Sequence, residues 1–296
     1  MRMASCTTEG SGRKGFVSCP CPYFRPTPLR NRLNYLPSHA RSITRLFLAK
    51  TSSSAEWRAV SSVIKTLVEE ATFEASSEAL TFRAMDPSHV ALVDLHWPKN
   101  AFERYECDKQ FKFSVRVEDF VKLIGRTEVK DSIEMTSTEG DALLLRLMDG
   151  YRREFEIHLI ESASGASPLP KLDFDVRLMM NKASFERVLT DISVVADQVM
   201  ISSSKDGVSF SGKSDVGGAV VQLGRDSAEI LELDVKQDAT GKYSLKYLLD
   251  ISKAIGSASD ALVIEYSTSK PVKLEFKLNE QGARIDQFLA PRVSSD

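Results

Sequence analysis

The sequence beyond residue 45 contains one pattern of residues twice, 128 positions apart. Segments 76–82 and 204–210 each consist of a polar turn followed by alternating polar and apolar residues. At the same offset Trp57 corresponds to Phe185, and each of these residues begins a run of apolar side chains at helical spacing. A repeat of this length predicts two copies of one structural unit, which limits the fold to two similar domains in succession.

Each repeat is expected to contain two amphipathic helices and several strands. In the first repeat Trp57 and Ile64 share one helical face, and a second helix is predicted to begin near Val117. Segments 154–159 and 272–278 alternate between apolar and charged residues, as strands with one buried face do. We therefore predict an α+β fold of two repeated domains, each an antiparallel sheet with two helices on one face.

The composition suggests where the domains begin and end. We expect a first domain at residues 46–160, a connector loop at 161–171 and a second domain at 172–296. The stretch 161–170 is rich in Ser, Gly and Pro, as exposed connectors are.

Residues 1–45 differ from the remainder in charge. Eight basic residues against one acid give them +7, and because the whole chain has −2, residues 46–296 carry −9. Five prolines and the absence of a sustained period predict a disordered basic extension. Three interpretations stay open: an organelle transit peptide, a metal site using Cys6, Cys19 and Cys21, and a solvated tail or a mis-assigned start upstream of true translation at residue 46.

Residues 46–296 contain none of the motifs that mark common catalytic sites, such as a phosphate-binding glycine loop, H-E-x-x-H or G-x-S-x-G. The strongest enzyme candidate is a hydrolase with Cys107 as nucleophile, His89 or His96 as base, and Asp86 or Asp94 as orienting carboxylate. A lone cysteine is more often a small buried apolar residue. We expect no catalytic residue, no metal ligand and no cofactor, and we keep the hydrolase as a distant alternative.

The run at residues 82–95, FRAMDPSHVALVDL, closely resembles the signature of the sliding clamps of archaea and eukaryotes, the proliferating cell nuclear antigen family. Leu169-Pro170 resembles the family's interdomain loop, and residues 288–293, FLAPRV, resemble its C-terminal segment. The resemblance covers residues 46–296.

The resemblance implies a closed ring of three subunits that encloses duplex DNA, with helices lining the hole and a continuous sheet outside. Such a ring is a processivity factor that tethers DNA polymerase and other replication and repair enzymes. An acidic body is a poor general DNA binder, but a ring is retained by topology and needs only weak contacts. The cations expected to face DNA are Arg58, Lys65, Lys122, Arg126, Arg187, Lys246 and Lys253.

Two further sites follow from the resemblance. A partner peptide with a glutamine and a turn of one aliphatic and two aromatic side chains is expected to bind a groove formed by Met85, His89, Val90, Leu92, Leu169, Pro170, Pro271, Phe288, Ala290, Pro291 and Val293. Ring closure is expected to pair strand 154–159 with strand 216–223 of the next subunit. The side chains expected at that interface are Phe155, Ile157, Ile192, Val195 and Val220.

The expected partners are duplex DNA, DNA polymerase, a clamp loader, a flap nuclease, a ligase and two further copies of the chain. Alternatives are a subunit of a heterotrimeric or checkpoint clamp, and a monomeric peptide-binding scaffold. No run of about 18 apolar residues could cross a membrane, and Cys107 is the only cysteine beyond residue 45. We expect a reducing compartment: cytoplasm or nucleoid in an archaeon, or the nucleus in a eukaryote, without secretion.

Overall fold

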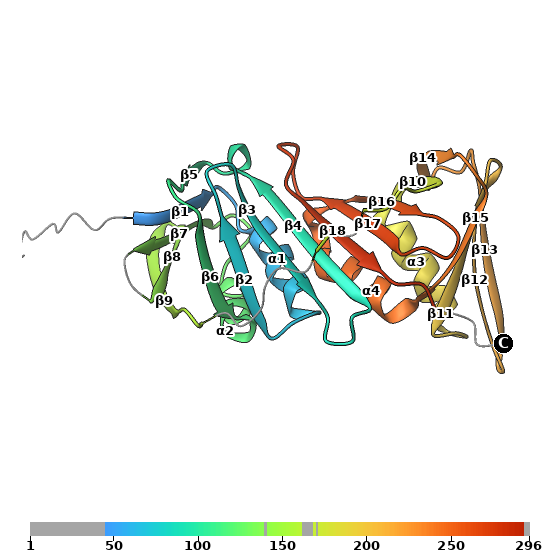
Figure 1. Ribbon diagram of the computed structural model, residues 1–296, viewed down its shortest axis with the longest axis horizontal. Helices are drawn as coiled ribbons and strands as arrows, with labels where there is room; N and C mark the ends of the chain where they lie inside the picture. Colours follow the sequence, from blue (N-terminus) through green and yellow to red (C-terminus); the bar gives the residue numbers. More distant parts are fainter. Residues whose placement is uncertain (1–44, 139–140, 162–167, 170, 293–296) are drawn as a thin grey trace, which may run out of the picture. The chain divides into compact units, whose positions relative to one another are not determined.

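The computed structural model describes residues 45–138, 141–161, 168–169 and 171–292. Residues 1–44 of the predicted extension 1–45 lie outside these residues, as do most of the predicted connector loop, Pro170 and Val293, whereas Arg45 begins the first strand. In the described part, the fold is the predicted α+β arrangement of antiparallel sheets and helices (Figure 1).

The described residues confirm the internal repeat, because both halves of the chain contain the same order of elements. A strand is followed by a helix, five strands, a second helix and three strands. In the first half these are β1 (Arg45–Thr51), α1 (Ala55–Lys65), β2 (Glu70–Ala75), β3 (Ala79–Met85), β4 (Ala91–Pro98), β5 (Arg104–Glu106), β6 (Phe111–Arg116), α2 (Val117–Ile124), β7 (Ser132–Thr138), β8 (Ala142–Asp149) and β9 (Tyr151–His158).

The second half repeats this order after the connector. Its elements are β10 (Val176–Asn181), α3 (Lys182–Ser193), β11 (Gln198–Ser204), β12 (Gly207–Ser214), β13 (Gly217–Gly224), β14 (Ile230–Val235), β15 (Ala239–Ser244), α4 (Leu245–Ile255), β16 (Ala261–Tyr266), β17 (Val272–Lys277) and β18 (Arg284–Leu289). Each predicted helix and strand therefore has its counterpart in the structure.

The strand order within the sheets is also repeated. The first half forms β5-β1-β7-β8-β9 and β4-β3-β2-β6, and the second forms β14-β10-β16-β17-β18 and β13-β12-β11-β15. The last strand of the second half, β18, pairs with β4 of the first, with Phe288 opposite Leu92, which makes a nine-stranded sheet. The corresponding strands β9 and β13 each end their sheet on one side in the described part. Figure 1 shows these two edges at opposite ends of the sheets.

The helices form one layer behind the sheets. Helix α1 contacts α2 and α4, and α4 contacts α3, so the layer runs α2-α1-α4-α3. The central contact, α1 against α4, joins the two halves on the helix side just as the β4–β18 pair joins them in the sheet. Each helix buries its apolar stripe against the sheets and leaves its polar stripe exposed.

Aromatic side chains fill the space between helices and sheets at repeated positions. Trp57 of α1 lies 4.6 Å from Trp97 of β4 between ring centroids, and both are fully buried. Phe185 of α3, the counterpart of Trp57, lies 6.3 Å from Phe210 of β12. Phe210 is the counterpart of Phe82 and not of Trp97, so the two equivalent helix residues pack against different strands of their repeats.

The loop after α2, residues 125–131, is held by charged and polar side chains. Arg153 of β9 donates to Asp131 Oδ2 at 2.6 Å and to the carbonyl oxygen of Arg126 at 3.1 Å. The Asp131 side chain is 0% exposed and also accepts the amide of Glu128 at 2.8 Å. Arg58 of α1 donates to the carbonyl oxygen of Thr127. A buried carboxylate thus depends on one arginine of an edge strand.

We expect Arg153→Ala to lower the free energy of unfolding by about 3 kcal/mol, because it leaves the Asp131 carboxylate buried without its cation. Arg152→Ala on the same strand is the control, since Arg152 is 59% exposed and its surface ion pair with Glu154 should contribute less than about 1 kcal/mol. Urea unfolding followed by circular dichroism measures both variants. Equal losses of unfolding free energy in the two variants would show that the ion pair of Arg153 with Asp131 contributes no more stability than the surface pair of Arg152 with Glu154.

Candidate functional site

The seven cations predicted on the helix face are all exposed in the structure. Four of them lie on the central helices, Arg58 and Lys65 on α1 and Lys246 and Lys253 on α4. The other three lie farther out in the same layer: Lys122 on α2, Arg126 just after α2, and Arg187 on α3. The structure therefore brings these residues together on one layer.

Carboxylates compensate several of these cations. Lys122 pairs with Glu118 at 2.7 Å, Lys246 with Asp250 at 2.8 Å and Arg187 with Glu229 at 3.4 Å. Within the described residues, Lys65 and Lys253 have no such ion pair. The hydrogen bond from Lys122 is the main reason that the pKa of Glu118 lies below its usual value.

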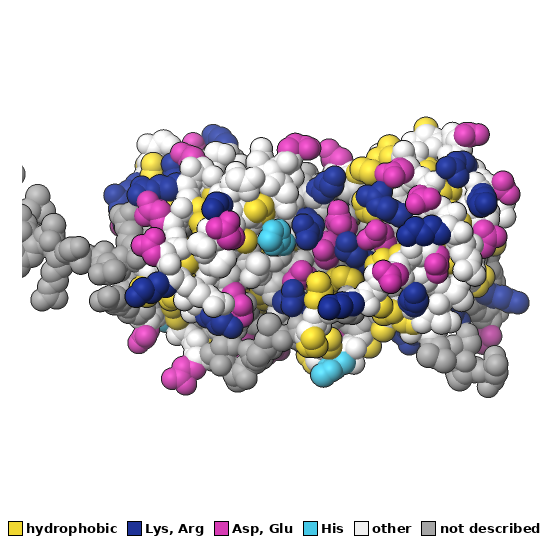
Figure 2. All heavy atoms as spheres, turned by 45° about the horizontal axis from the view of Figure 1, so that its top comes forward, with side chains coloured by type: hydrophobic (Ala, Val, Ile, Leu, Met, Phe, Trp, Pro, Cys, Tyr) yellow, Lys and Arg dark blue, Asp and Glu magenta, His cyan; other side chains and the backbone are white. Residues whose placement is uncertain are grey.

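The four helices are close to neutral as a group. They contain seven basic and six acidic residues, which gives +1, whereas residues 46–296 as a whole carry −9. On the sheet side of the molecule, which Figure 2 presents, basic and acidic side chains are also interleaved, with no large area of a single charge. The helix layer is thus less negative than its surroundings without being a strongly basic surface, which permits only weak attraction of a polyanion.

A tight turn joins β3 to β4, and a buried carboxylate organises it. Asp86 accepts hydrogen bonds from the amides of Ser88 at 3.1 Å, Val90 at 2.7 Å and Ala91 at 2.6 Å. Burial alone would raise the pKa of Asp86, but the bonds from Ala91 and Val90 outweigh it, so the pKa lies below its usual value. His89 has φ of 59°, in the left-handed region that only a few non-glycine residues adopt.

This turn lies beside the end of β18. The amide of Ala290 donates to the carbonyl oxygen of Val90 at 2.9 Å. Leu92 lies opposite Met85 of β3 and opposite Phe288 of β18, so these three side chains form a row on the sheet face that is turned away from the helices. The two halves of the chain therefore build one surface at this point.

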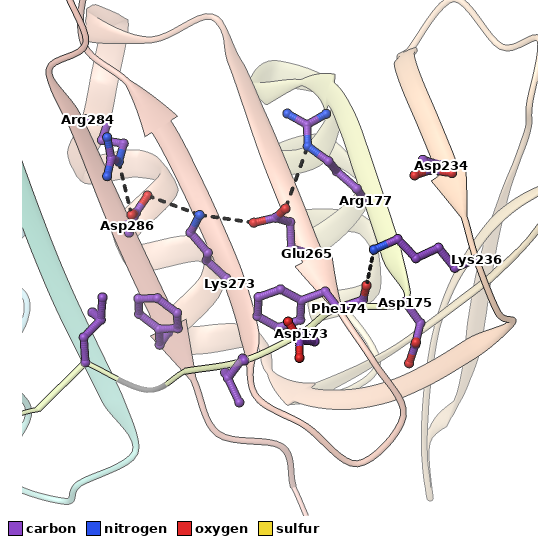
Figure 3. Close-up of a pocket in the computed structure, with 13 residues that line it drawn as sticks. Asp173, Phe174, Asp175, Arg177, Asp234, Lys236, Glu265, Lys273, Arg284 and Asp286 are labelled. Atoms are coloured by element: carbon purple, nitrogen blue, oxygen red, sulfur yellow. Dashed lines mark hydrogen bonds and ion pairs between the residues drawn. The ribbon is translucent and has the colours of Figure 1, made fainter.

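A cavity of about 420 Å³ extends from Phe288 across the strands of the second half, beneath residues 172–175 (Figure 3). Its lining residues are Leu169, Leu172, Asp173, Phe174, Asp175, Arg177, Asp234, Lys236, Glu265, Lys273, Arg284, Asp286 and Phe288. The four apolar members come from the connector side and from β18. This cavity therefore has a charged floor and an apolar end.

The cations of this floor are already bound within the chain. Lys273 lies 3.1 Å from Glu265, 2.9 Å from Glu275 and 3.8 Å from Asp286 (Figure 3). Arg284 lies 3.4 Å from Asp286. Burial outweighs both cations and raises the pKa of Asp286 to about 6.

The predicted groove residues divide into two sets. Leu169 and Phe288 line the cavity. The remaining described ones lie outside its lining, on the turn, on the adjacent strands or after β18: Met85, His89, Val90, Leu92, Pro271, Ala290 and Pro291.

The predicted interface residues lie on or near β9 and β13, each of which is an end strand of its sheet in the described part. Phe155 and Ile157 of β9 lie opposite the buried residues Leu145 and Leu143, so they face the helices. Ile157 is buried within the single chain and Phe155 is half-buried. Near the other edge, Ile192 of α3 is fully buried and Val195 is half-buried.

Val220 does not lie where it was expected. Strand alternation turns it to the face away from the helices, opposite Ser211, and leaves it 63% exposed. Val221, which lies opposite the buried Phe210, shares the helix side with Leu223. The residues of β13 that can meet Phe155 on the same face are therefore Val221 and Leu223, a one-residue shift from the prediction.

The structure does not assemble the hydrolase alternative. Cys107 Sγ donates to the carbonyl oxygen of Lys109, and burial raises the pKa of this thiol. Asp86 is occupied by backbone amides and Asp94 by Arg83 at 2.7 Å. Among the described residues no group of three or more His, Cys, Asp or Glu side chains is placed to hold a metal ion. No helix in this part of the chain is long and apolar enough to span a bilayer.

Sequence reasoning missed the charged floor and the Asp86 network. Arg177, Glu265 and Lys273 alternate with buried residues along their strands and are typical of solvent-facing positions. Only the register of β10, β16 and β17 shows that they lie side by side. Two consecutive polar residues within the strand, Asp286 and Gln287, were the available signal.

Comparisons with known proteins agree with these features. Family models of the proliferating cell nuclear antigen match residues 46–161 (N-terminal domain) and 168–292 (C-terminal domain). The chain is 46% identical over 249 residues to a protein named DNA polymerase sliding clamp from Cenarchaeum symbiosum, covering 84% of this chain and 99% of that one. It is 45% identical, with the same coverage, to the DNA polymerase sliding clamp of Nitrosopumilus maritimus.

A solved structure shows a similar fold. The crystal structure of PCNA from Thermococcus kodakaraensis superposes with a TM-score of 0.79, covering 83% of this chain and all of that one, at 21% identity.

The raised pKa of Asp286 predicts a pH-dependent stability. The folded state holds the proton more tightly than the unfolded state between about pH 4 and pH 6, so this contribution is lost as the pH rises through 6. The free energy of unfolding of Asp286→Asn, relative to that of the original chain, should therefore increase by roughly 2 kcal/mol between pH 4.5 and pH 7, measured by urea unfolding. Asp234→Asn, an exposed carboxylate of the same cavity, is the control. If the difference in the free energy of unfolding between Asp286→Asn and the original chain does not change with pH, the raised pKa of Asp286 is contradicted.

Proposed function

The chain belongs to the proliferating cell nuclear antigen family, and we propose that it is a DNA sliding clamp, a processivity factor that encircles duplex DNA and tethers DNA polymerase to it. The observation that carries this proposal is the repeated architecture, which leaves two complementary sheet edges and one layer of helices. The named relatives support it, since they are DNA polymerase sliding clamps that match this chain over nearly their whole length.

Ring closure is supported by the pairing that already exists inside the chain. Strand β18 pairs with β4, and their counterparts in the other halves are β9 and β13, which are both unpaired on one side in the described part. Because the halves have the same strand order, β9 of one copy can meet β13 of the next in the way that β18 meets β4. An exposed edge with apolar residues favours such a partner. A head-to-tail contact of this kind closes into a ring or continues as a filament. We infer a ring of three copies.

The charges of the helix layer support a ring whose inner surface binds DNA weakly enough to move along it. In the ring, α2 of one copy would meet α3 of the next, as α1 meets α4 within the chain, and the layer would become continuous. The seven exposed cations would then face the duplex. Because three of the seven are paired with nearby carboxylates, the contacts with phosphate are expected to be few and weak, which permits motion along DNA.

The outer surface is proposed to bind partner proteins. The row formed by Met85, Leu92 and Phe288, together with Leu169, offers apolar contacts for aromatic anchors of a short peptide. DNA polymerase, a clamp loader, a flap nuclease and a ligase would share this groove. The role is non-catalytic, and the compartment is the one that contains the chromosome.

Replication assays test the proposed function. With a DNA polymerase and clamp loader from the same cells, the chain should lengthen products on a primed circular template under single-encounter conditions. Lys65→Glu combined with Lys253→Glu should shorten these products several-fold, because like charges repel the phosphates. Lys109→Glu with Lys277→Glu, two exposed lysines off the helices, is the control with the same change in charge. Products that never depend on the chain would refute the clamp function.

Light scattering coupled to size exclusion tests the ring. The chain should elute as a trimer, and Phe155→Arg should elute as a monomer because it places an unpaired charge in an apolar contact. Leu231→Arg, a change at an exposed apolar residue away from both edges, is the control and should remain trimeric. A Phe155→Arg variant that is folded by circular dichroism and still trimeric at low concentration would overturn the proposed interface. A monomeric original chain would favour a heterotrimeric clamp.

A further inference from the structure

We propose that Tyr247, on the helix side of the molecule, is a positioning residue for the partner groove on the opposite face. Its hydroxyl group holds the carboxylate of Asp86, and Asp86 holds the turn that supplies His89 and Val90 to the groove. This inference rests on the proposed function, because it concerns the same groove. It adds a residue that does not line the groove and that comes from the other half of the chain.

The contact between the two halves is direct. Tyr247 Oη donates a hydrogen bond to Asp86 Oδ2 at 3.0 Å. Asp86 belongs to the turn between β3 and β4, whereas Tyr247 lies in the first turn of α4, 161 residues later in the chain. The main-chain carbonyl of Tyr247 also lies within 3.5 Å of Gln287 Nε2 on β18, the strand that pairs with β4. Tyr247 thus contacts both the turn between β3 and β4 in the first half of the chain and strand β18 in the second half.

Tyr247 supplies one of the two hydrogen bonds that the structure shows at Oδ2 of Asp86. Oδ1 accepts the amides of Val90 and Ala91, while Oδ2 accepts only the amide of Ser88, at 3.1 Å, besides the tyrosine. The residue is 5% exposed, so water cannot readily replace a lost donor. A buried carboxylate that loses one hydrogen bond either shifts toward water or takes up a proton. Both responses would loosen the turn.

The turn is the part of the groove that most requires such support. His89 adopts a left-handed backbone conformation, which costs energy in a residue with a β-carbon. Val90 is fixed by two contacts: its amide binds Asp86, and its carbonyl oxygen accepts the amide of Ala290 at 2.9 Å. When the carboxylate is displaced, the first contact weakens and the wall formed by His89 and Val90 moves relative to Phe288. Preorganised walls bind peptides more tightly because less order is lost on binding.

Removal of the hydroxyl group alone tests the inference. The probe is a fluorescein-labelled peptide with one glutamine followed by a turn bearing a leucine and two adjacent phenylalanines, titrated with the full chain and followed by fluorescence anisotropy. We expect Tyr247→Phe to weaken binding roughly fivefold, the ratio that a typical net hydrogen bond contributes. The aromatic ring stays in place, so the packing of α4 is preserved.

Tyr105→Phe is the matched control. Tyr105 is also half-buried, and its hydroxyl donates to the carbonyl oxygen of Ser76 at 2.9 Å, away from the groove. It should lower the melting temperature to a similar extent without changing the affinity for the peptide. Equal losses of affinity in both variants would overturn the proposal, because the effect would then follow general stability.

A double-mutant cycle and amide exchange separate positioning from a purely structural role. If Tyr247 acts through Asp86, Tyr247→Phe should have no further effect on peptide affinity in an Asp86→Asn background. Hydrogen exchange at the amides of Val90 and Ala91 should be faster in Tyr247→Phe and unchanged in Tyr105→Phe. Unchanged exchange at these two amides, or additive losses of affinity in the cycle, would refute the positioning role.

The exchange measurement also distinguishes the inference from the function on which it rests. If the original chain does not bind the peptide at all, the proposed partner groove fails, and the exchange rates still decide whether Tyr247 orders the turn. Leu169→Ala supplies the opposite case, since it removes an apolar side chain of the groove that is not among the hydrogen-bond partners of Asp86. It should weaken the peptide without changing exchange at Val90.

Discussion

The main-chain pairing of β4 with β18 is the contact on which the other functional surfaces depend. It joins the last strand of the second half to the first, so that one sheet of nine strands runs through the molecule. It places Phe288 beside Leu92, which creates the row of apolar side chains in the groove. It also brings α4 against α1, which makes the helix layer continuous. The counterparts of β18 and β4 in the other halves, β9 and β13, are each unpaired on one side in the described part. The pairing that joins the two halves of one chain is therefore also available between copies of the chain.

Charge has different roles on the two faces. On the helix face, ion pairs within the layer reduce the attraction for phosphate, so in the proposed ring retention on DNA would depend on enclosure rather than on affinity. On the opposite face, carboxylates surround Lys273 on three strands, and the burial of Asp286 makes part of this network costly to ionise. Such a network contributes little net stability, yet it orients the side chains beneath the connector. The apolar end of the cavity, near Phe288, is then the place where a partner can gain most from burial.

Most of the fold could be predicted from the sequence, because apolar periodicity and a repeat at one offset are local signals. The correspondence of Trp57 with Phe185 predicted equivalent helices, and both residues are core anchors. The exposed cations could be predicted for the same reason, since a helical face is determined by spacing. Val220 shows the limit: the direction of a strand side chain depends on strict alternation, and an error of one residue reverses the face. The charged floor and the Tyr247–Asp86 contact could not be predicted, because each depends on register between strands or on contact between elements far apart in the chain.

The position of Tyr247 gives the two halves of the chain a connection that strand pairing alone cannot supply. Backbone hydrogen bonds between β4 and β18 fix distance and register, and the amide of Ala290 extends this pairing to Val90 in the turn. Tyr247 adds a contact with the turn from the helix side, since α4 is itself packed between α1 and α3. The same helix carries Lys246 and Lys253 on its exposed side. The helix layer and the groove wall are therefore directly connected, because the turn proposed to contact partners is bound by the helix proposed to face the duplex. This arrangement explains why a carboxylate is buried at a surface turn, where burial would otherwise disfavour its charge.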